Sequence, residues 1–193
     1  MRALSPDEVR TSFINATEPE LARLELPWWF DATLWDSLDY LGWTDPQLPD
    51  RGYLVAETGW GLAGVTLRLP SVRPRGRHAL CNLCCTQHRG EGAVLMVARR
   101  AGKAGLDHNT VGTYICADLA CSLYLRGLRR ATGGGRLPET LDPDARTRRL
   151  RHNVEVFLSR VAGPPSAAPG TPGRTTPSDD PTSTFHRWDT PAG

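Results

Sequence analysis

The sequence predicts an α+β chain in which a small helical N-terminal region precedes a β-hairpin and a cysteine-containing module that ends in a helix. Helix-capping patterns recur within the first fifty residues, whereas runs of apolar and β-branched residues begin at Tyr53. All five cysteines lie between Cys81 and Cys121. The chain has 193 residues, of which 39% are hydrophobic, so it can form one ordinary domain or two small ones packed together.

The first fifty residues are predicted to form short helices. The segment Ser5-Pro6-Asp7-Glu8 combines a capping hydroxyl, a proline in the first turn and a glutamate three residues after the cap, which predicts a helix to about Ala16. Thr17-Glu18-Pro19-Glu20 repeats this pattern. A third helix is expected over residues 31 to 40 or 41, with Gly42 at its end.

Most of the tryptophans belong to the same region. Because large aromatic side chains are usually buried, we expect them to form much of a small core rather than an exposed binding face. Five of the six precede residue 61, namely Trp28, Trp29, Trp35, Trp43 and Trp60.

The middle of the chain predicts two hairpins. Residues 53–57 and 62–69 are rich in apolar and β-branched residues and flank a Thr-Gly turn. Residues 93–98 and 110–115 form a second pair of this kind, joined by a glycine-rich loop.

The C-terminal part predicts one more helix and then a tail. Asp142-Pro143 is a typical helix start, and apolar residues follow at helical spacing as far as Val161. From 163 to 193, twenty of 31 residues are Gly, Pro, Ser or Thr, which bury too little apolar surface to offset the entropy of ordering. We therefore expect a helical region over 1–50, the hairpins, cysteines and last helix over 51–162, and a disordered tail over 163–193.

Charge is distributed unevenly. Residues 1–66 hold four Arg against eleven Asp and Glu, whereas residues 67–160 hold seventeen Arg and Lys against seven Asp and Glu. A basic module beside an acidic one indicates a phosphate backbone or an acidic protein surface as a partner. Mutual attraction between the two halves is the alternative.

The chain is expected to be a cytoplasmic monomer without a membrane partner. No run approaches the roughly 20 apolar residues of a membrane-spanning helix, and polar residues follow Met1 without an apolar signal core. An odd, sparse set of five cysteines favours metal binding in a reducing compartment over a disulfide framework.

Two cysteine pairs suggest a zinc site. Cys81-Asn82-Leu83-Cys84 can bring two thiolates onto one ion from a tight knuckle, and Cys116 and Cys121 can complete a tetrahedron. We expect one structural zinc ion, with Cys81, Cys84, Cys116 and Cys121 as its ligands. Cys85 adjoins Cys84, so either could be the second ligand, although knuckle geometry favours Cys84.

The surrounding pattern predicts a treble-clef zinc finger. A knuckle, a hairpin and a helix from Asp118 to about Leu128, whose first turn carries Cys121, follow one another along the chain. Four cysteines leave no open coordination position, so we expect no catalytic zinc. For the same reason we expect three nearby histidines to be loop residues without metal, namely His78, His88 and His108.

Two stretches of the sequence resemble a known family. Cys81-Asn82-Leu83-Cys84 and residues 109–127, which read NTVGTYICADLACSLYLRG, are similar to the C-terminal treble-clef zinc finger of the elongation factor G binding proteins. That family includes the FusB-type fusidic acid resistance proteins. The resemblance covers about residues 78 to 160.

The resemblance implies a role in translation. The zinc domain of that family binds elongation factor G and helps to release it from the ribosome when fusidic acid has locked it there. Cys81, Cys116 and Cys121 match metal positions of the family. The resistance proteins have His where Cys121 stands and a further Cys where Tyr124 stands, so Cys84 would supply the fourth ligand here. A housekeeping or stress-related role in translation is then as compatible as drug resistance.

These observations favour a binding module without enzymatic activity and without catalytic residues. The expected partner is elongation factor G, with the ribosome or its RNA as a further one. The contact surface is expected to combine a basic hairpin loop with cations beyond the zinc-finger helix, namely Arg99, Arg100, Lys103, Arg126, Arg129 and Arg130. Ordinary solvated arginines are the alternative.

Two rival functions remain. A basic treble clef with a Gly-Lys-Ala-Gly loop at residues 102–105 could hold an RNA backbone, which makes the chain a zinc-dependent nucleic-acid-binding module. Cys85 could instead be a nucleophile or thiol switch, with His88 as the base that lowers the pKa of its thiol.

Overall fold

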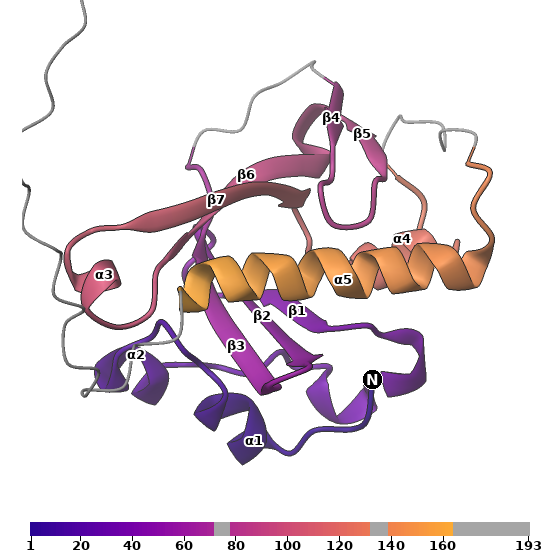
Figure 1. Cartoon of the computed structure of the whole chain (residues 1–193). Helices are drawn as coiled ribbons and strands as arrows, with labels where there is room; N and C mark the ends of the chain where they lie inside the picture. Colours follow the sequence, from indigo (N-terminus) through magenta and orange to yellow (C-terminus); the bar gives the residue numbers. More distant parts are fainter. Residues whose placement is uncertain (72–77, 132–138, 164–193) are drawn as a thin grey trace, which may run out of the picture.

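The computed structural model describes residues 1–71, 78–131 and 139–163 (Figure 1). The larger of its two sheets has five strands in the order β1-β2-β3-β6-β7, each antiparallel to its neighbour, and the smaller sheet pairs β4 with β5. The strands are β1 (Leu41–Thr44), β2 (Arg51–Thr58), β3 (Gly61–Arg68), β4 (His78–Leu80), β5 (Gln87–Arg89), β6 (Ala93–Arg99) and β7 (Thr110–Cys116).

The helices are mostly short. They are α1 (Pro6–Thr11), α2 (Glu18–Ala22), α3 (Gly102–Leu106), α4 (Cys121–Leu125) and α5 (Pro143–Ala162), with 3-10 turns η1 (Phe30–Ala32), η2 (Trp35–Ser37) and η3 (Gly90–Gly92). This mixture of helix and sheet confirms the predicted α+β class. Within the described ranges, no helix is long and apolar enough to cross a membrane.

Both faces of the β1–β3 part of the sheet are covered. Helix α5 lies on one side of these strands, and α1 and α2 lie on the other (Figure 1). Side chains of β2 therefore alternate between two cores: Leu54 packs with Phe157 of α5, whereas Tyr53 packs with Phe13 of the N-terminal segment. Burial on both faces explains why β2 is almost continuously apolar rather than alternating.

Helix α5 matches its predicted start and apolar face. The Asp142 carboxylate accepts a hydrogen bond of 2.7 Å from the backbone amide of Ala145, which caps the helix. The predicted apolar positions are all buried, namely Leu150, Val154, Phe157, Leu158 and Val161.

The first helix is shorter than predicted. Ser5 and Glu8 form the expected capping box, but α1 ends at Thr11 instead of near Ala16. The chain then pairs with β3, because the Gly64 amide donates to the Ser12 carbonyl oxygen at 2.8 Å and the Ile14 amide donates back to Gly64 at 2.9 Å. Sheet pairing thus replaces the last turns of the predicted helix.

The third predicted helix is wrong. Residues 31 to 41 contain the 3-10 turns η1 and η2, and Leu41 already belongs to β1. Gly42 is not a helix end: it pairs with Leu54, and a Cβ added there would lie 2.7 Å from the Tyr40 ring and 2.8 Å from the Leu119 Cβ. Close packing of β1 against the zinc-finger half therefore explains this glycine.

The tryptophans only partly form the expected core. Trp43 is 3% exposed, and Trp29 and Trp35 pack partly buried against the same cluster. Trp28 is 94% exposed and Trp60 is 49% exposed, so the prediction is wrong for these two. Trp60 lies at the tip of the β2–β3 turn.

Both predicted hairpins are confirmed, as β2–β3 and β6–β7. The glycine-rich connection of the second hairpin contains α3, and the zinc-finger helix is shorter than predicted, because α4 begins at Cys121 and ends at Leu125. The predicted tail beyond residue 163 lies outside the described residues. The boundary between residues 50 and 51 stays a prediction, although β1 pairs with β2 across it.

Candidate metal centre

The first cysteine pair is held in a knuckle between β4 and β5. The Cys85 amide donates to the Cys81 carbonyl oxygen at 2.9 Å, and the Cys81 amide donates to Thr86 at 3.0 Å. Cys85 adopts a left-handed backbone conformation with φ 59°, at the residue where the chain turns back into β5. Cys84 belongs to the sulfur cluster and Cys85 does not, which decides between the two candidates.

The second pair bridges the end of β7 and the start of α4. Cys116 is the last residue of the strand, and Cys121 is the first of the helix. The four residues between them form a tight turn, in which Leu119 has φ 57° and donates its amide to the Cys116 carbonyl oxygen at 2.8 Å. This turn accommodates a spacer longer than the common two residues.

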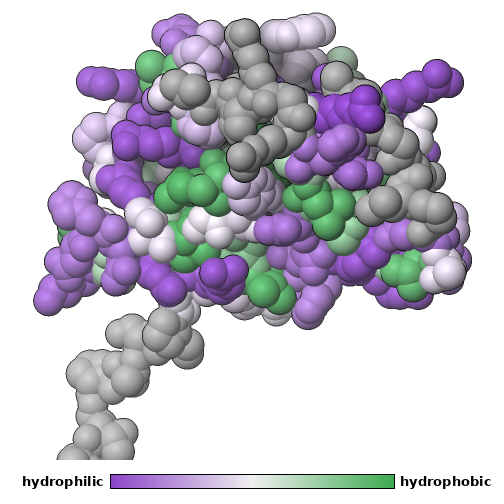
Figure 2. Space-filling model, turned by 90° about the horizontal axis from the view of Figure 1, so that it is seen from above, coloured by the Kyte–Doolittle hydropathy of each residue, from purple (hydrophilic) through white to green (hydrophobic). Residues whose placement is uncertain are grey.

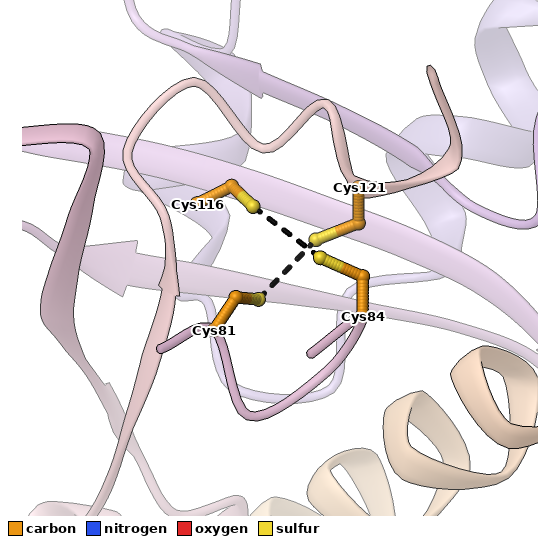
Figure 3. Close-up of side chains that lie close together, drawn as sticks. All are labelled: Cys81, Cys84, Cys116 and Cys121. Atoms are coloured by element: carbon orange, nitrogen blue, oxygen red, sulfur yellow. Dashed lines mark hydrogen bonds between the residues drawn. The ribbon is translucent and has the colours of Figure 1, made fainter. Parts of the chain in front are cut away.

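The four sulfur atoms converge on one point (Figure 3). All lie within 4.8 Å of one another, and the pairs Cys81–Cys121 and Cys84–Cys116 are 3.6 Å and 3.5 Å apart. Zinc–sulfur bonds of about 2.3 Å in a tetrahedron separate the sulfurs by roughly 3.8 Å, so the spacing suits one zinc ion. Exposure of the four residues is 4% or less, so the site has no side open to solvent.

The neighbouring cysteines shift one another's thiol pKa values. Burial raises the pKa of Cys81, but hydrogen bonds from Cys116 and Cys121 outweigh it and hold that pKa well below its usual range. Burial likewise raises the pKa of Cys121, and its sulfur neighbours raise it further. Zinc binding must therefore displace protons from this cluster, so the affinity for zinc decreases as the pH is lowered.

His88 lies directly outside the cluster. Its Nε2 is 3.2 Å from the Cys116 sulfur, and its ring meets the Tyr124 ring edge-on at 4.9 Å. Burial lowers the pKa of His88, so the neutral ring with a proton on Nε2 can donate to the Cys116 thiolate. The expectation of loop histidines is wrong for His78 and His88, because His78 lies on β4 and His88 is fully buried on β5. The sequence shows that His88 is close to the first cysteine pair, but nothing in it indicates that the ring contacts the Cys116 sulfur.

The N-terminal half also reaches the metal centre. Tyr40 is 1% exposed, and its hydroxyl has no hydrogen-bond partner within the described residues. Burial, followed by the charge of Cys121, raises the pKa of Tyr40 well above its usual value, and Tyr40 belongs to the same buried core cluster as the four cysteines. Nothing in the sequence around Tyr40 indicated this proximity.

The six cations predicted as a partner surface do not form one patch. Arg99, the last residue of β6, lines a cleft with Glu20, whereas the next residue, Arg100, lines a different cavity together with Glu155 of α5. The other group follows α4, which adjoins the opposite end of β7. Six residue steps along that strand separate the two groups by roughly 20 Å.

Three of these cations are held in ion pairs. Arg99 contacts Glu20 at 2.7 Å, and Arg129 contacts Asp118 at 3.2 Å beside the second cysteine pair. Arg126 binds the fully buried carboxylate of Asp39 through both terminal nitrogens. Within the described ranges, the remaining three make no ion pair, namely Arg100, Lys103 and Arg130.

An apolar cavity adjoins the metal centre. It has a volume of about 750 Å³ and lies between the N-terminal segment, with Trp28 and Leu34, and the turn that joins the second cysteine pair, with Leu119. Arg129 also lines it. Exposed apolar side chains therefore lie next to the turn that joins the second cysteine pair.

A match to a family model agrees with this geometry. The family model described as "FBP C-terminal treble-clef zinc-finger" matches residues 8–161. No curated protein matches the chain. A solved structure, the fusidic acid resistance protein FusC, is similar at 17% sequence identity with a TM-score of 0.46, over 63% of this chain. The chain spans about half of that protein, 51% of its length. With a family match over most of its length and four clustered cysteines suited to one zinc ion, the chain belongs to the FBP C-terminal treble-clef zinc-finger family.

Proposed function

We propose that this protein is a non-catalytic binding module that recognises elongation factor G. The proposal rests on family membership together with the resemblance of residues 109–127 to the elongation factor G binding proteins. The observation that carries it is the closed metal centre. Four buried thiolates fill a tetrahedral shell, so the ion supplies structural stability to the surrounding surface and offers no position to a substrate.

The hairpin next to the centre offers contact area for a protein partner. Leu95 and Tyr114 lie directly opposite each other on β6 and β7, and they are 44% and 43% exposed. Leu80 of β4 is 43% exposed. Seen from above, where β4 to β7 lie in Figure 1, the surface shows apolar residues bordered by hydrophilic ones (Figure 2). Exposed apolar patches rimmed by polar groups are typical of protein-binding sites.

Charge adds a second contribution. Arg100 and Lys103 lie beyond one end of this hairpin, and Arg129 and Arg130 lie beyond the other. Each pair can steer an acidic partner, with the main effect on the association rate. Arg99, Arg126 and Arg129 stay in the proposed surface, although their internal ion pairs leave them less charge to offer.

A titration of zinc-loaded protein with purified elongation factor G tests the proposal. We expect Tyr114→Ser to weaken binding, because it removes exposed apolar contact area without disturbing the core. Arg100→Glu with Lys103→Glu, and separately Arg129→Glu with Arg130→Glu, should slow association, and added salt should reduce the difference. Arg148→Glu, on the exposed side of α5, is the matched charge control.

The same titration with ribosomal RNA fragments separates the rival function. Tight RNA binding with a steep salt dependence, and no affinity for the factor, would favour the nucleic-acid-binding module instead. If binding to the factor is confirmed, the finer proposal is release of the factor from the ribosome. Addition of this protein to a ribosome–factor complex held by fusidic acid, followed by separation of free factor, measures it.

A further inference from the structure

A polar cleft lies on the sheet, away from the metal centre. Its volume is about 520 Å³, and its walls come from α2, the loop before β2, and strands β2, β3, β6 and β7. The cationic lining residues are Arg51, Arg68 and Arg99, and the exposed His108 also lines the cleft. The acidic ones are Glu20 and Asp50.

Two of these arginines oppose each other. Arg51 of β2 and Arg68 of β3 are directly paired in antiparallel register, so their side chains leave the same face of the sheet. Like charges at such a position are destabilising, because the Cβ atoms are only about 4.5–5.5 Å apart. Across the described part of the chain, no carboxylate forms an ion pair with either guanidinium, not even that of Asp50.

The other polar contact of Arg51 does not neutralise its charge. Its guanidinium lies near the Tyr53 hydroxyl and lowers the pKa of that group, although burial and Asp45 outweigh this and raise the pKa to about 12. The hydroxyl itself donates to Asp45 at 2.8 Å. The positive charges of Arg51 and Arg68 therefore remain available to a ligand in the cleft.

The third arginine is fixed on the far wall. Arg68 pairs with Val97 of β6, and Arg99 follows two residues later on the same face. Glu20 holds the Arg99 guanidinium at 2.7 Å. The Asn15 side chain donates to the backbone oxygens of Thr66 and Arg99, at 3.1 Å and 2.9 Å, which fastens β3 to β6 at this point. The spacing between the two walls is thus set by the fold before any ligand arrives.

We propose that this cleft binds phosphate groups, with Arg51 and Arg68 as paired ligands and Arg99 on the opposite wall. Planar guanidinium groups match phosphate oxygens through paired, charge-assisted hydrogen bonds. A multiply charged anion would relieve the Arg51–Arg68 repulsion. Among the residues that the structure describes, no Phe, Trp or Tyr lines the cleft, so recognition is of phosphates rather than of a stacked base. Val97, Arg99 and Thr110 line the cleft on the same face of the β6–β7 hairpin as Leu95 and Tyr114, so the cleft adjoins the surface proposed for elongation factor G and adds a ligand class to this protein.

Titration with inorganic pyrophosphate at constant ionic strength tests the proposal on the zinc-loaded protein. We expect a rise in melting temperature and measurable heat of binding for the wild type. Arg68→Gln, at an exposed position, and Arg51→Gln should each weaken pyrophosphate binding at least about tenfold, as expected for a lost charge-assisted contact. Without ligand, both variants should melt at the wild-type temperature or above it, because repulsion is removed.

Three controls complete the test. Arg148→Gln makes the same charge change at an exposed position of α5, outside the cleft, and should keep the full pyrophosphate response. Zinc content is measured after each titration, because pyrophosphate can bind zinc. Tyr114→Ser, which lies outside the cleft and should weaken binding to elongation factor G, should keep the full pyrophosphate response, so failure of this proposal and failure of the proposed function are distinguishable.

A short single-stranded RNA identifies the source of the phosphate. Loss of RNA binding in Arg68→Gln would assign the cleft to an RNA backbone, whereas a response to pyrophosphate alone would assign it to a small phosphorylated ligand. The proposal is overturned if neither anion binds, or if Arg51→Gln and Arg68→Gln bind as Arg148→Gln does.

Discussion

The buried carboxylate of Asp39 accepts hydrogen bonds from both terminal nitrogens of Arg126, a residue 87 positions later in the chain. Asp39 precedes β1, and Arg126 ends α4 of the zinc finger. Arg151 of α5 binds the same carboxylate at 3.0 Å. Together with Glu20–Arg99, this contact shows that part of the charge asymmetry is satisfied internally, as attraction between the acidic and basic halves.

Removing this carboxylate should destabilise the protein strongly. Asp39→Ala leaves the Arg126 guanidinium without its partner, and breaking a buried ion pair in this way typically costs about 3–5 kcal/mol of unfolding free energy. Arg151→Ala removes a half-exposed partner and should cost at most about 1 kcal/mol. Denaturant unfolding of both variants measures the difference, and equal losses would contradict it.

The same residue predicts an acid-dependent loss of stability. Burial alone would raise the pKa of Asp39, but hydrogen bonds from Arg126 and Arg151 outweigh it and lower the pKa. A carboxyl whose folded pKa is depressed stabilises the fold above its unfolded pKa of about 3.9, and this stability is lost as pH falls through the folded value. Unfolding curves between neutral and acid pH should show a smaller decline for Asp39→Asn than for the wild type.

Metal removal should unfold the zinc finger. Protein purified without added zinc should contain about one equivalent, and Cys121→Ser should lose it together with the β6–β7 and α4 structure. Cys85→Ser, next to the knuckle but outside the cluster, should keep the metal and the melting temperature. Metal analysis with circular dichroism decides the matter, and a zinc-free wild type that melts like the loaded protein would refute the structural role.

His88 should increase the affinity of the metal centre for zinc. His88→Ala removes the contact with the Cys116 sulfur, and loss of such a supporting contact typically costs 10–100-fold in metal affinity. Competition with a chromogenic chelator measures the affinity. His78→Ala, at an exposed position on β4, should leave it unchanged.

Gly42 should tolerate no side chain. Gly42→Ala places a Cβ 2.7 Å from the Tyr40 ring and 2.8 Å from the Leu119 Cβ, and overpacking of this kind costs about 1–3 kcal/mol. Gly112→Ala on β7 meets the flexible end of Leu95 at 3.3 Å and should cost less. Thermal melts of the two variants provide the comparison, and similar melting temperatures would show that β1 can move away from Leu119.

The local parts of this structure follow from the sequence because short-range interactions decide them. The capping box at Ser5 and the cap at Asp142 are contacts between residues three apart, and the hairpins follow from apolar runs on either side of turns. The two cysteine pairs indicate their metal because few other arrangements use thiolates at such spacing. Even the choice of Cys84 over Cys85 follows from the geometry of a knuckle.

Tertiary structure alone decided how distant segments share one surface. Residues 31 to 41 have helical spacing, but Leu41–Thr44 pair with β2 as a strand. Paired backbone groups and burial against Tyr53 outweigh the weak local preference for helix. The same pairing brought Asp39 to Arg126 and Tyr40 to the cysteines. Pairing of β2 with β3 set Arg51 against Arg68, and pairing of β3 with β6 brought Arg99 to the same cleft. Those relations depend on strand register and order between segments far apart in the chain, and no periodicity within one segment encodes them.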